Sequence, residues 1–246
     1  MKRVYTILDI AKKKQEKDCD SVFVVVGRER SGKSHFTLAC MDYLGANDNQ
    51  IVIDKNKLGE SLASLKDCDA FHFDEAADGL LSKDAMNKWN KELERLFMII
   101  GAKRLITFLL IPDFFLLSPY FRKQRVTGLF WVYKRGSVAF FSRKKIDKIN
   151  FYHDKYRTNR ITIKSSCYDR FFIYKGKLLK SYLEKKRTKV DGLINAFTEK
   201  LKEPPKHELT KKQKVLQLLR NGWKASDIVK ELDTSMNYVY KVREMA

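Results

Sequence analysis

Two glycines, a lysine and a serine occur at a spacing that suits the binding of phosphate groups. Residues 27–34 read Gly-Arg-Glu-Arg-Ser-Gly-Lys-Ser, which fits the pattern G-x-x-x-x-G-K-S. The glycines let the backbone curl so that its amides face an anion, the lysine can reach the outer phosphates of a nucleotide, and the serine hydroxyl can ligate Mg²⁺. The sequence therefore predicts a site for a nucleoside triphosphate and Mg²⁺, made of Gly27, Arg28, Glu29, Arg30, Ser31, Gly32, Lys33, Ser34 and His35.

The stretches on either side of this loop predict the elements that position it. Residues 22–26 form an apolar, β-branched run that is typical of a strand buried on both faces. Residues 35–41 continue with apolar side chains at helical spacing. A strand, a glycine-containing loop and a helix in this order are the context in which the motif binds phosphate, so a turn without a ligand is the less favoured alternative.

A second pair of chemically active side chains follows another short apolar run. Residues 70–76 read Ala-Phe-His-Phe-Asp-Glu-Ala, and a strand here brings Asp74 and Glu75 to the sheet edge that holds the loop. Asp74 is expected to hold Mg²⁺, directly or through water, and Glu75 to orient and deprotonate an attacking water. An Asp-Glu pair after a strand is by itself more often a helix N-terminus. Its place about 40 residues after the loop favours the catalytic interpretation.

Together the two motifs resemble those of the P-loop ATPases that carry a catalytic glutamate beside the Walker B aspartate (the ASCE group). This group contains the FtsK/HerA-type DNA translocases, the viral genome-packaging ATPases and the zonular-occludens-toxin-like phage proteins. The resemblance covers roughly residues 20–150. It implies ATP hydrolysis with Lys33 and Glu75 in catalysis and with Ser34 and Asp74 on the metal, and it implies an origin in a virus or plasmid.

Other polar positions lie where the resemblance implies contacts to the nucleotide. The predicted strand 105–111 is followed by Asp113, at the place of a polar sensor residue in the resembling families; alternatively Asp113 caps the next segment. Arg122 and Arg125 lie on a predicted short helix over 118–125. The resemblance implies that such an arginine reaches the γ-phosphate of a neighbouring subunit in a homo-oligomer, of which a hexameric ring is one form. The alternative is that both arginines are solvated or touch DNA.

Further apolar stretches complete an expected sheet of five or six strands. Residues 50–54 predict a strand that ends at Asp54, and residues 128–133 with 137–142 predict a hairpin. Residues 151–174 interleave aromatic and basic side chains. That pattern favours packing against the sheet edge, and the alternative is binding of single-stranded nucleic acid.

The composition points to a polyanionic partner. The 246 residues carry a net charge of +20, and residues 151–246 hold 23 basic against 11 acidic residues. This surplus favours nucleic acid before an acidic membrane surface, the alternative being a generally basic proteome.

The four cysteines are widely spaced, which argues against a zinc site or a disulfide framework. We expect no secretory leader in the charged first 20 residues and no membrane insertion at 96–117, hence a cytoplasmic location.

Residues 206–246 follow a Pro-Pro break and predict three short helices. Thr210, Ser226 and Ser235 are the expected N-caps, and Asn-Gly at 221–222 ends the first helix. The spacing resembles a helix-turn-helix module, whose last helix enters the major groove of double-stranded DNA. A helical interaction module without DNA is the alternative. The candidate DNA contacts are Met236, Asn237, Tyr240, Lys241 and Arg243.

The sequence thus predicts an α/β protein with a three-layer P-loop NTPase core. The core, with a mainly parallel sheet and a terminal hairpin, takes residues 1–175, a helical connector and linker takes 176–205, and a small all-α helix-turn-helix domain takes 206–246. We expect an ATP-hydrolysing DNA-associated motor or DNA-handling ATPase of the translocase or packaging type. The alternative is a nucleotide-dependent DNA-binding regulator or partition-type switch without translocation. A P-loop kinase is less favoured, because Glu75 beside Asp74 suits water as the acceptor.

Overall fold

The chain forms two compact units, Met1–Gly192 and Leu193–Ala246. The computed structural model describes residues 1–54, 57–74, 91–92, 94–99, 101–202 and 211–244. Each unit has its own buried apolar cluster, and the division between them falls inside the long helix α6 (Leu178–Lys202). The connector expected at 176–205 therefore begins as part of the first unit.

The first unit is built on a seven-stranded sheet with the order β2-β3-β4-β1-β5-β6-β7. The strands from β2 to β5 are parallel, and β6 and β7 add to the edge as antiparallel neighbours. The bounds are β1 (Ser21–Val26), β2 (Ile51–Val52), β3 (Ala70–Asp74), β4 (Ile106–Leu110), β5 (Val126–Lys134), β6 (Ser137–Ser142) and β7 (Cys167–Arg170). This arrangement confirms the α/β class with a mainly parallel sheet and a hairpin beyond it.

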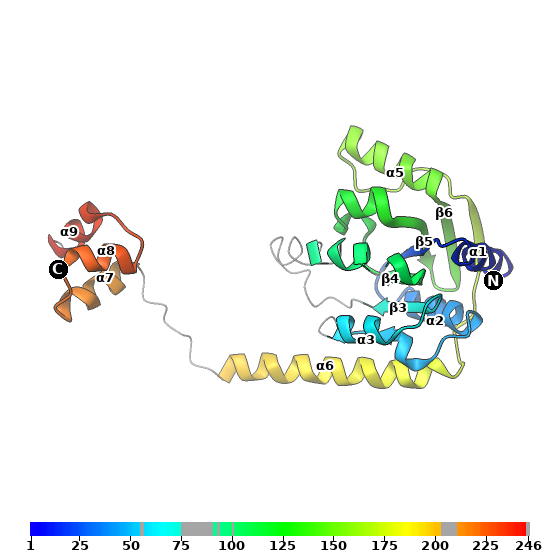
Figure 1. Ribbon diagram of the computed structural model, residues 1–246, viewed down its shortest axis with the longest axis horizontal. Helices are drawn as coiled ribbons and strands as arrows, with labels where there is room; N and C mark the ends of the chain where they lie inside the picture. Colours follow the sequence, from blue (N-terminus) through cyan, green and yellow to red (C-terminus); the bar gives the residue numbers. More distant parts are fainter. Residues whose placement is uncertain (55–56, 75–90, 93, 100, 203–210, 245–246) are drawn as a thin grey trace. The chain divides into compact units, whose positions relative to one another are not determined.

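Helices cover both faces of this sheet (Figure 1). One face packs against α1 (Lys2–Gln15), α2 (Lys33–Tyr43) and the first part of α6, next to η1 (Asp48–Gln50). The other face packs against α3 (Leu58–Ser64) and α5 (Arg143–Tyr156), and against the short turns η4 (Phe114–Leu116) and η5 (Phe121–Arg125), while η3 (Gly101–Lys103) precedes β4. The helices therefore form layers above and below the sheet.

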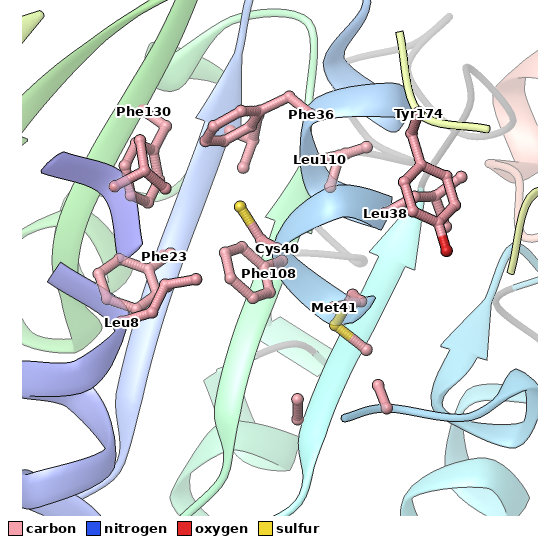
Figure 2. Close-up of a cluster of buried hydrophobic side chains, with 14 of the residues drawn as sticks. Leu8, Phe23, Phe36, Leu38, Cys40, Met41, Phe108, Leu110, Phe130 and Tyr174 are labelled. Atoms are coloured by element: carbon pink, nitrogen blue, oxygen red, sulfur yellow. The ribbon is translucent and has the colours of Figure 1, made fainter. Parts of the chain in front are cut away.

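The central strands are apolar because both of their faces are covered. All residues of β1 and β4 are buried, as expected for interior parallel strands. Figure 2 shows part of the cluster on the α2 face, where the rings of Phe36 and Phe130 lie 5.1 Å apart and those of Phe23 and Phe108 lie 5.6 Å apart. Each buried phenylalanine contributes about 1.5–3 kcal/mol to stability relative to an exposed one.

Several expectations about the strands and helices of this unit were wrong in extent. The sheet has seven strands rather than five or six, because residues 167–170 pair with β6. The strand expected at 50–54 is reduced to two residues, since η1 occupies the chain up to Gln50. The short helix expected over 118–125 is present, with α-helical residues 119–120 followed by the π-helix η5 at 121–125. Helix α5 was not expected, because half of its residues are charged and it buries only Ile146, Ile149 and Asn150.

In the described part of the second unit, the end of α6 is followed by α7 (Lys211–Arg220), α8 (Ala225–Glu231) and α9 (Met236–Glu244). Its core consists of Val215, Ile228, Val239 and Val242. Gly222 ends α7 with a φ of +79°, and the Ser235 hydroxyl accepts a 3.3 Å hydrogen bond from the Tyr238 amide at the start of α9. The predicted cap at Ser226 was wrong. The structure places the N-cap of α8 at Lys224, and the Ser226 hydroxyl instead donates to Asp227.

Among the helices in the described part of the chain, none is both long and apolar enough to cross a membrane.

Candidate functional site

The predicted nucleotide loop lies at the carboxyl edge of the parallel strands. It follows β1 directly and leads into α2 at Lys33. In the strand register Asp74 pairs with Leu110, and Leu110 pairs with Val25, so the end of β3 lies level with the end of β1. The neighbouring strands β1 and β4 continue over opposite faces, into α2 and into η4. In open α/β sheets, ligands bind outside the carboxyl ends of the strands, at the point where neighbouring connections diverge in this way.

The glycines of the loop are needed for its conformation. Gly27 has a φ of +152°, and a Cβ atom there would lie 2.4 Å from the carbonyl oxygen of Val132 on β5. Gly32 has a φ of +99° at the N-cap of α2. A side chain at Gly27 would have to displace β5, and side-chain-bearing residues rarely adopt the backbone at either position. The loop can therefore approach the sheet closely while leaving its backbone accessible.

Lys33 is held against this loop. Its ammonium group donates hydrogen bonds to the carbonyl oxygens of Gly27 at 2.6 Å and Arg28 at 3.0 Å. Burial lowers the pKa of Lys33, and the charge of Asp74 opposes that shift. A half-buried ammonium group that donates to carbonyl oxygens of the loop can exchange these partners for phosphate oxygens.

Ser34 and Asp74 meet at the start of α2. The Ser34 hydroxyl donates to the Asp74 carboxylate at 3.3 Å, and Asp74 is 6% exposed. A hydroxyl and a carboxylate are oxygen ligands of the kind that Mg²⁺ prefers, usually together with waters and substrate phosphates. The described residues contain no group of three or more His, Cys, Asp and Glu side chains that could hold a metal. The donor set at this position fits an ion that is held mainly by a nucleotide.

A tyrosine from α6 joins this pair. The Tyr182 hydroxyl donates to Asp74 at 2.5 Å and lies 2.8 Å from the Ser34 hydroxyl oxygen. One turn later the Lys186 ammonium donates to the Tyr182 oxygen at 3.0 Å and lies 3.7 Å from the Asp74 carboxylate. Burial, followed by the charge of Asp74, raises the pKa of Tyr182 well above its ordinary value. The phenol is therefore a neutral hydrogen-bond donor to the carboxylate.

A buried histidine lies beneath this network. His72 is fully buried on β3, and its ring meets the Tyr182 ring edge-on at 6.0 Å between centroids. Burial lowers the pKa of His72 to about 4, with Asp74 opposing and Lys186 and Lys185 adding to the shift. Neither ring nitrogen of His72 has a hydrogen-bond partner within the described residues. The imidazole is neutral at physiological pH.

Two polar atoms of the loop region lack partners inside the described structure. The Ser31 hydroxyl and Nδ1 of His35 are buried and make no hydrogen bond there. Unsatisfied buried polar groups are costly, and ligand contacts are one reason for retaining them. With the glycines, Lys33 and the Ser34–Asp74 pair, they give the loop residues a donor set that suits a nucleoside triphosphate.

The remaining predicted catalytic residues do not gather at this loop in the described structure. Glu75 lies outside the described residues. Arg122 is 2% exposed and lies over the rings of Phe114 and Phe115, so it faces the core. Arg125 forms an ion pair with Asp20, which lies just before β1. This pair is therefore at the amino end of the strand, whereas the loop is at its carboxyl end.

The Asp113 carboxylate accepts a 2.9 Å hydrogen bond from the Phe115 amide. This residue is the N-cap of η4, which is the alternative considered for it in place of a sensor role.

The predicted DNA contacts share one side of α9. Val239 and Val242 point into the core of the second unit and are at most 2% exposed. The five candidates are exposed: Met236, Asn237, Tyr240, Lys241 and Arg243.

Sequence reasoning missed Tyr182 and Lys186. The available signal was a spacing of four residues between Leu178, Tyr182 and Lys186, which places them on one face of a helix. That spacing does not say which part of the protein the face contacts.

No protein-family model matches the chain, and no curated protein is similar enough to it to count as a match.

Proposed function

We propose that this protein is an ATP-binding and ATP-hydrolysing enzyme with a P-loop NTPase core, and that it acts on DNA through a C-terminal helix-turn-helix. The cytoplasmic location expected from the sequence remains a prediction. The proposal combines the loop motif and its position at the carboxyl edge of the sheet with the basic, exposed side of α9.

One observation carries the nucleotide part of the proposal. The Ser34 hydroxyl and the Asp74 carboxylate come from segments 40 residues apart and lie 3.3 Å from each other. The motif assigns a metal-ligating role to the serine, and the second apolar run assigns the same role to the aspartate. The general packing of an α/β protein does not require a Ser34–Asp74 hydrogen bond beside a glycine-containing loop, whereas the binding of a nucleotide with its metal ion does use such a pair.

Each residue then has a role. Lys33 holds the outer phosphates, the backbone of the loop surrounds them, and Ser34 with Asp74 holds Mg²⁺. The metal ion, when bound, neutralises phosphate charge. Glu75, which follows Asp74 directly, is the candidate base for the attacking water.

The DNA part rests on charge and on exposure. The net charge of +20 favours a polyanionic partner. Lys241 and Arg243 suit phosphate contacts, while Asn237 and Tyr240 suit base edges. The motor type is favoured over other DNA-handling enzymes only by the resemblance of the two motifs.

The experiment that tests the nucleotide part is equilibrium binding of ATP in the presence of Mg²⁺ to the full chain. Lys33→Ala should weaken binding by about tenfold or more, since the ammonium makes charge-assisted contacts to phosphate. Lys148→Ala is the matched control, because Lys148 is an exposed lysine on α5. Equal affinities in the wild type and Lys33→Ala would contradict the assignment of the loop.

A nucleotide-dependent DNA-binding regulator is the second candidate. The contacts of Tyr182 and Lys186 with Asp74 favour it, because they link the nucleotide position to the helix that leads towards the second unit. ATP turnover with and without duplex DNA separates the two candidates. A motor should turn over ATP faster on DNA, whereas a regulator should bind ATP and change its DNA affinity with little turnover.

A further inference from the structure

The Tyr182 hydroxyl contacts both of the predicted metal ligands. It lies 2.5 Å from the Asp74 carboxylate and 2.8 Å from the Ser34 hydroxyl oxygen. An Mg²⁺ ion bound to an oxygen ligand lies only about 2.0–2.1 Å from it and keeps near-ideal octahedral geometry. The hydroxyl donates its proton to Oδ2 of Asp74, an oxygen with which the carboxylate would ligate the ion. The hydroxyl and the ion therefore compete for this oxygen.

Lys186 reinforces this arrangement through charge. Its ammonium group lies 3.7 Å from the Asp74 carboxylate and donates to the Tyr182 oxygen at 3.0 Å. A cation that already faces the carboxylate repels an incoming Mg²⁺ and neutralises the charge that would attract it. Tyr182 and Lys186 thus satisfy the Asp74 carboxylate with a hydrogen bond and a positive charge, in place of coordination to a metal ion.

The first part of α6 packs against the face of the sheet that α2 also covers (Figure 1). Leu178 and Tyr182 are buried in the cluster on the α2 face. The Lys185 ammonium donates to the carbonyl oxygens of Asp48 at 2.5 Å and Ile51 at 2.9 Å. Lys189 donates to the carbonyl oxygen of Ile53 at 2.8 Å. These contacts fix the position of the helix and hold Tyr182 beside Asp74. The Tyr182–Asp74 hydrogen bond is therefore a consequence of how α6 packs on the sheet.

We propose that the docked first part of α6 is an autoinhibitory element that competes with Mg²⁺-nucleotide for the Ser34–Asp74 pair. The inference rests on the proposed nucleotide site and adds its regulation. Entry of the metal with the nucleotide displaces Tyr182 and Lys186 and loosens the first turns of α6. The second unit is joined to this helix beyond Gly192, so nucleotide binding changes the segment from which the helix-turn-helix extends.

The first test is the affinity of the full chain for the nonhydrolysable analogue AMP-PNP, with Mg²⁺ and with EDTA. Tyr182→Phe keeps the ring and removes the hydroxyl, so it should strengthen Mg²⁺-dependent binding by about tenfold or more, because a hydrogen bond to a charged group is lost from the competing state. Binding in EDTA should change less than about twofold, since no metal then competes with the hydroxyl. Tyr168→Phe is the matched control, because Tyr168 is half exposed on β7.

The second test is hydrogen exchange at the amides of residues 178–189. Saturating Mg²⁺ and AMP-PNP should speed their exchange in the wild type, because a helix without its packing is only marginally stable in water. Equal affinities of wild type and Tyr182→Phe, or unchanged or slower exchange at 178–189, would overturn the competition and leave the nucleotide site standing. An absence of nucleotide binding in every variant would overturn both.

Discussion

Ser34 and Asp74 lie 3.3 Å apart at the carboxyl edge of the sheet, one at the start of α2 and the other at the end of β3. Parallel pairing through β4 produces this proximity, because it sets the ends of β1 and β3 level with each other. The pair is the structural centre of the nucleotide site proposed for this protein.

Gly27 should tolerate no side chain. A Cβ atom would lie 2.4 Å from the Val132 carbonyl oxygen at a φ of +152°, so Gly27→Ala should lower the free energy of unfolding by about 2 kcal/mol or more. Gly59→Ala on α3 is the control, because that Cβ would meet no atom within 4 Å and alanine favours the helix. Urea denaturation measures both variants. A Gly27→Ala protein as stable as the wild type would show that the loop does not need this close approach to β5.

The buried His72 should make stability depend on pH. The pKa of His72 falls from 6.5 to about 4 in the folded protein, mainly through burial. The charge of Asp74 opposes the shift, and those of Lys186 and Lys185 add to it. Below pH 6.5 the unfolded chain binds a proton that the folded chain does not. His72 therefore leaves the free energy of unfolding unchanged above pH 6.5 and lowers it as the pH falls towards 4. The loss approaches about 1.4 kcal/mol per pH unit.

Urea unfolding at pH 7.5 and pH 5 tests this dependence. His72→Leu removes the titrating group and should flatten the difference in unfolding free energy between the two pH values. The same difference in the variant and the wild type would assign the pH effect to other groups.

If the protein binds DNA as proposed, the exposed side of α9 should make the contacts. Lys241→Ala should weaken binding to all duplex sequences alike and reduce the slope of log affinity against log salt by about one unit, because one phosphate contact is lost. Asn237→Ala should instead relax the sequence preference. Lys230→Ala on α8 serves as the control, since Lys230 is exposed on another helix. Fluorescence anisotropy with labelled duplexes measures these quantities, and full retention of DNA binding by Lys241→Ala would argue against docking through α9.

The sequence carried the local features of the site. The apolar strands β1 and β3, the glycines of the loop and Asp74 could be predicted because each is encoded within a few neighbouring residues. The hairpin β5–β6 followed in the same way from two apolar stretches around a short turn.

Long-range contacts escaped prediction for a physical reason. Residues 178–189 have the pattern of a charged helix, and nothing local states that Tyr182 meets Asp74 or that Lys185 and Lys189 bind carbonyl oxygens near β2. Helix α5 and strand β7 likewise depend on neighbours to cover them, because their own residues alternate few apolar side chains with many charges.

The proposed ATPase with Glu75 as its base can be tested by steady-state ATP turnover of the full chain with Mg²⁺ and duplex DNA. We expect measurable turnover in the wild type and a loss of about 100-fold or more in Glu75→Gln, with ATP binding retained, because a positioned base contributes about that factor. Glu16→Gln, which changes an exposed glutamate just after α1, should match the wild type. Equal turnover in the wild type and Glu75→Gln would show that Glu75 is not the catalytic base.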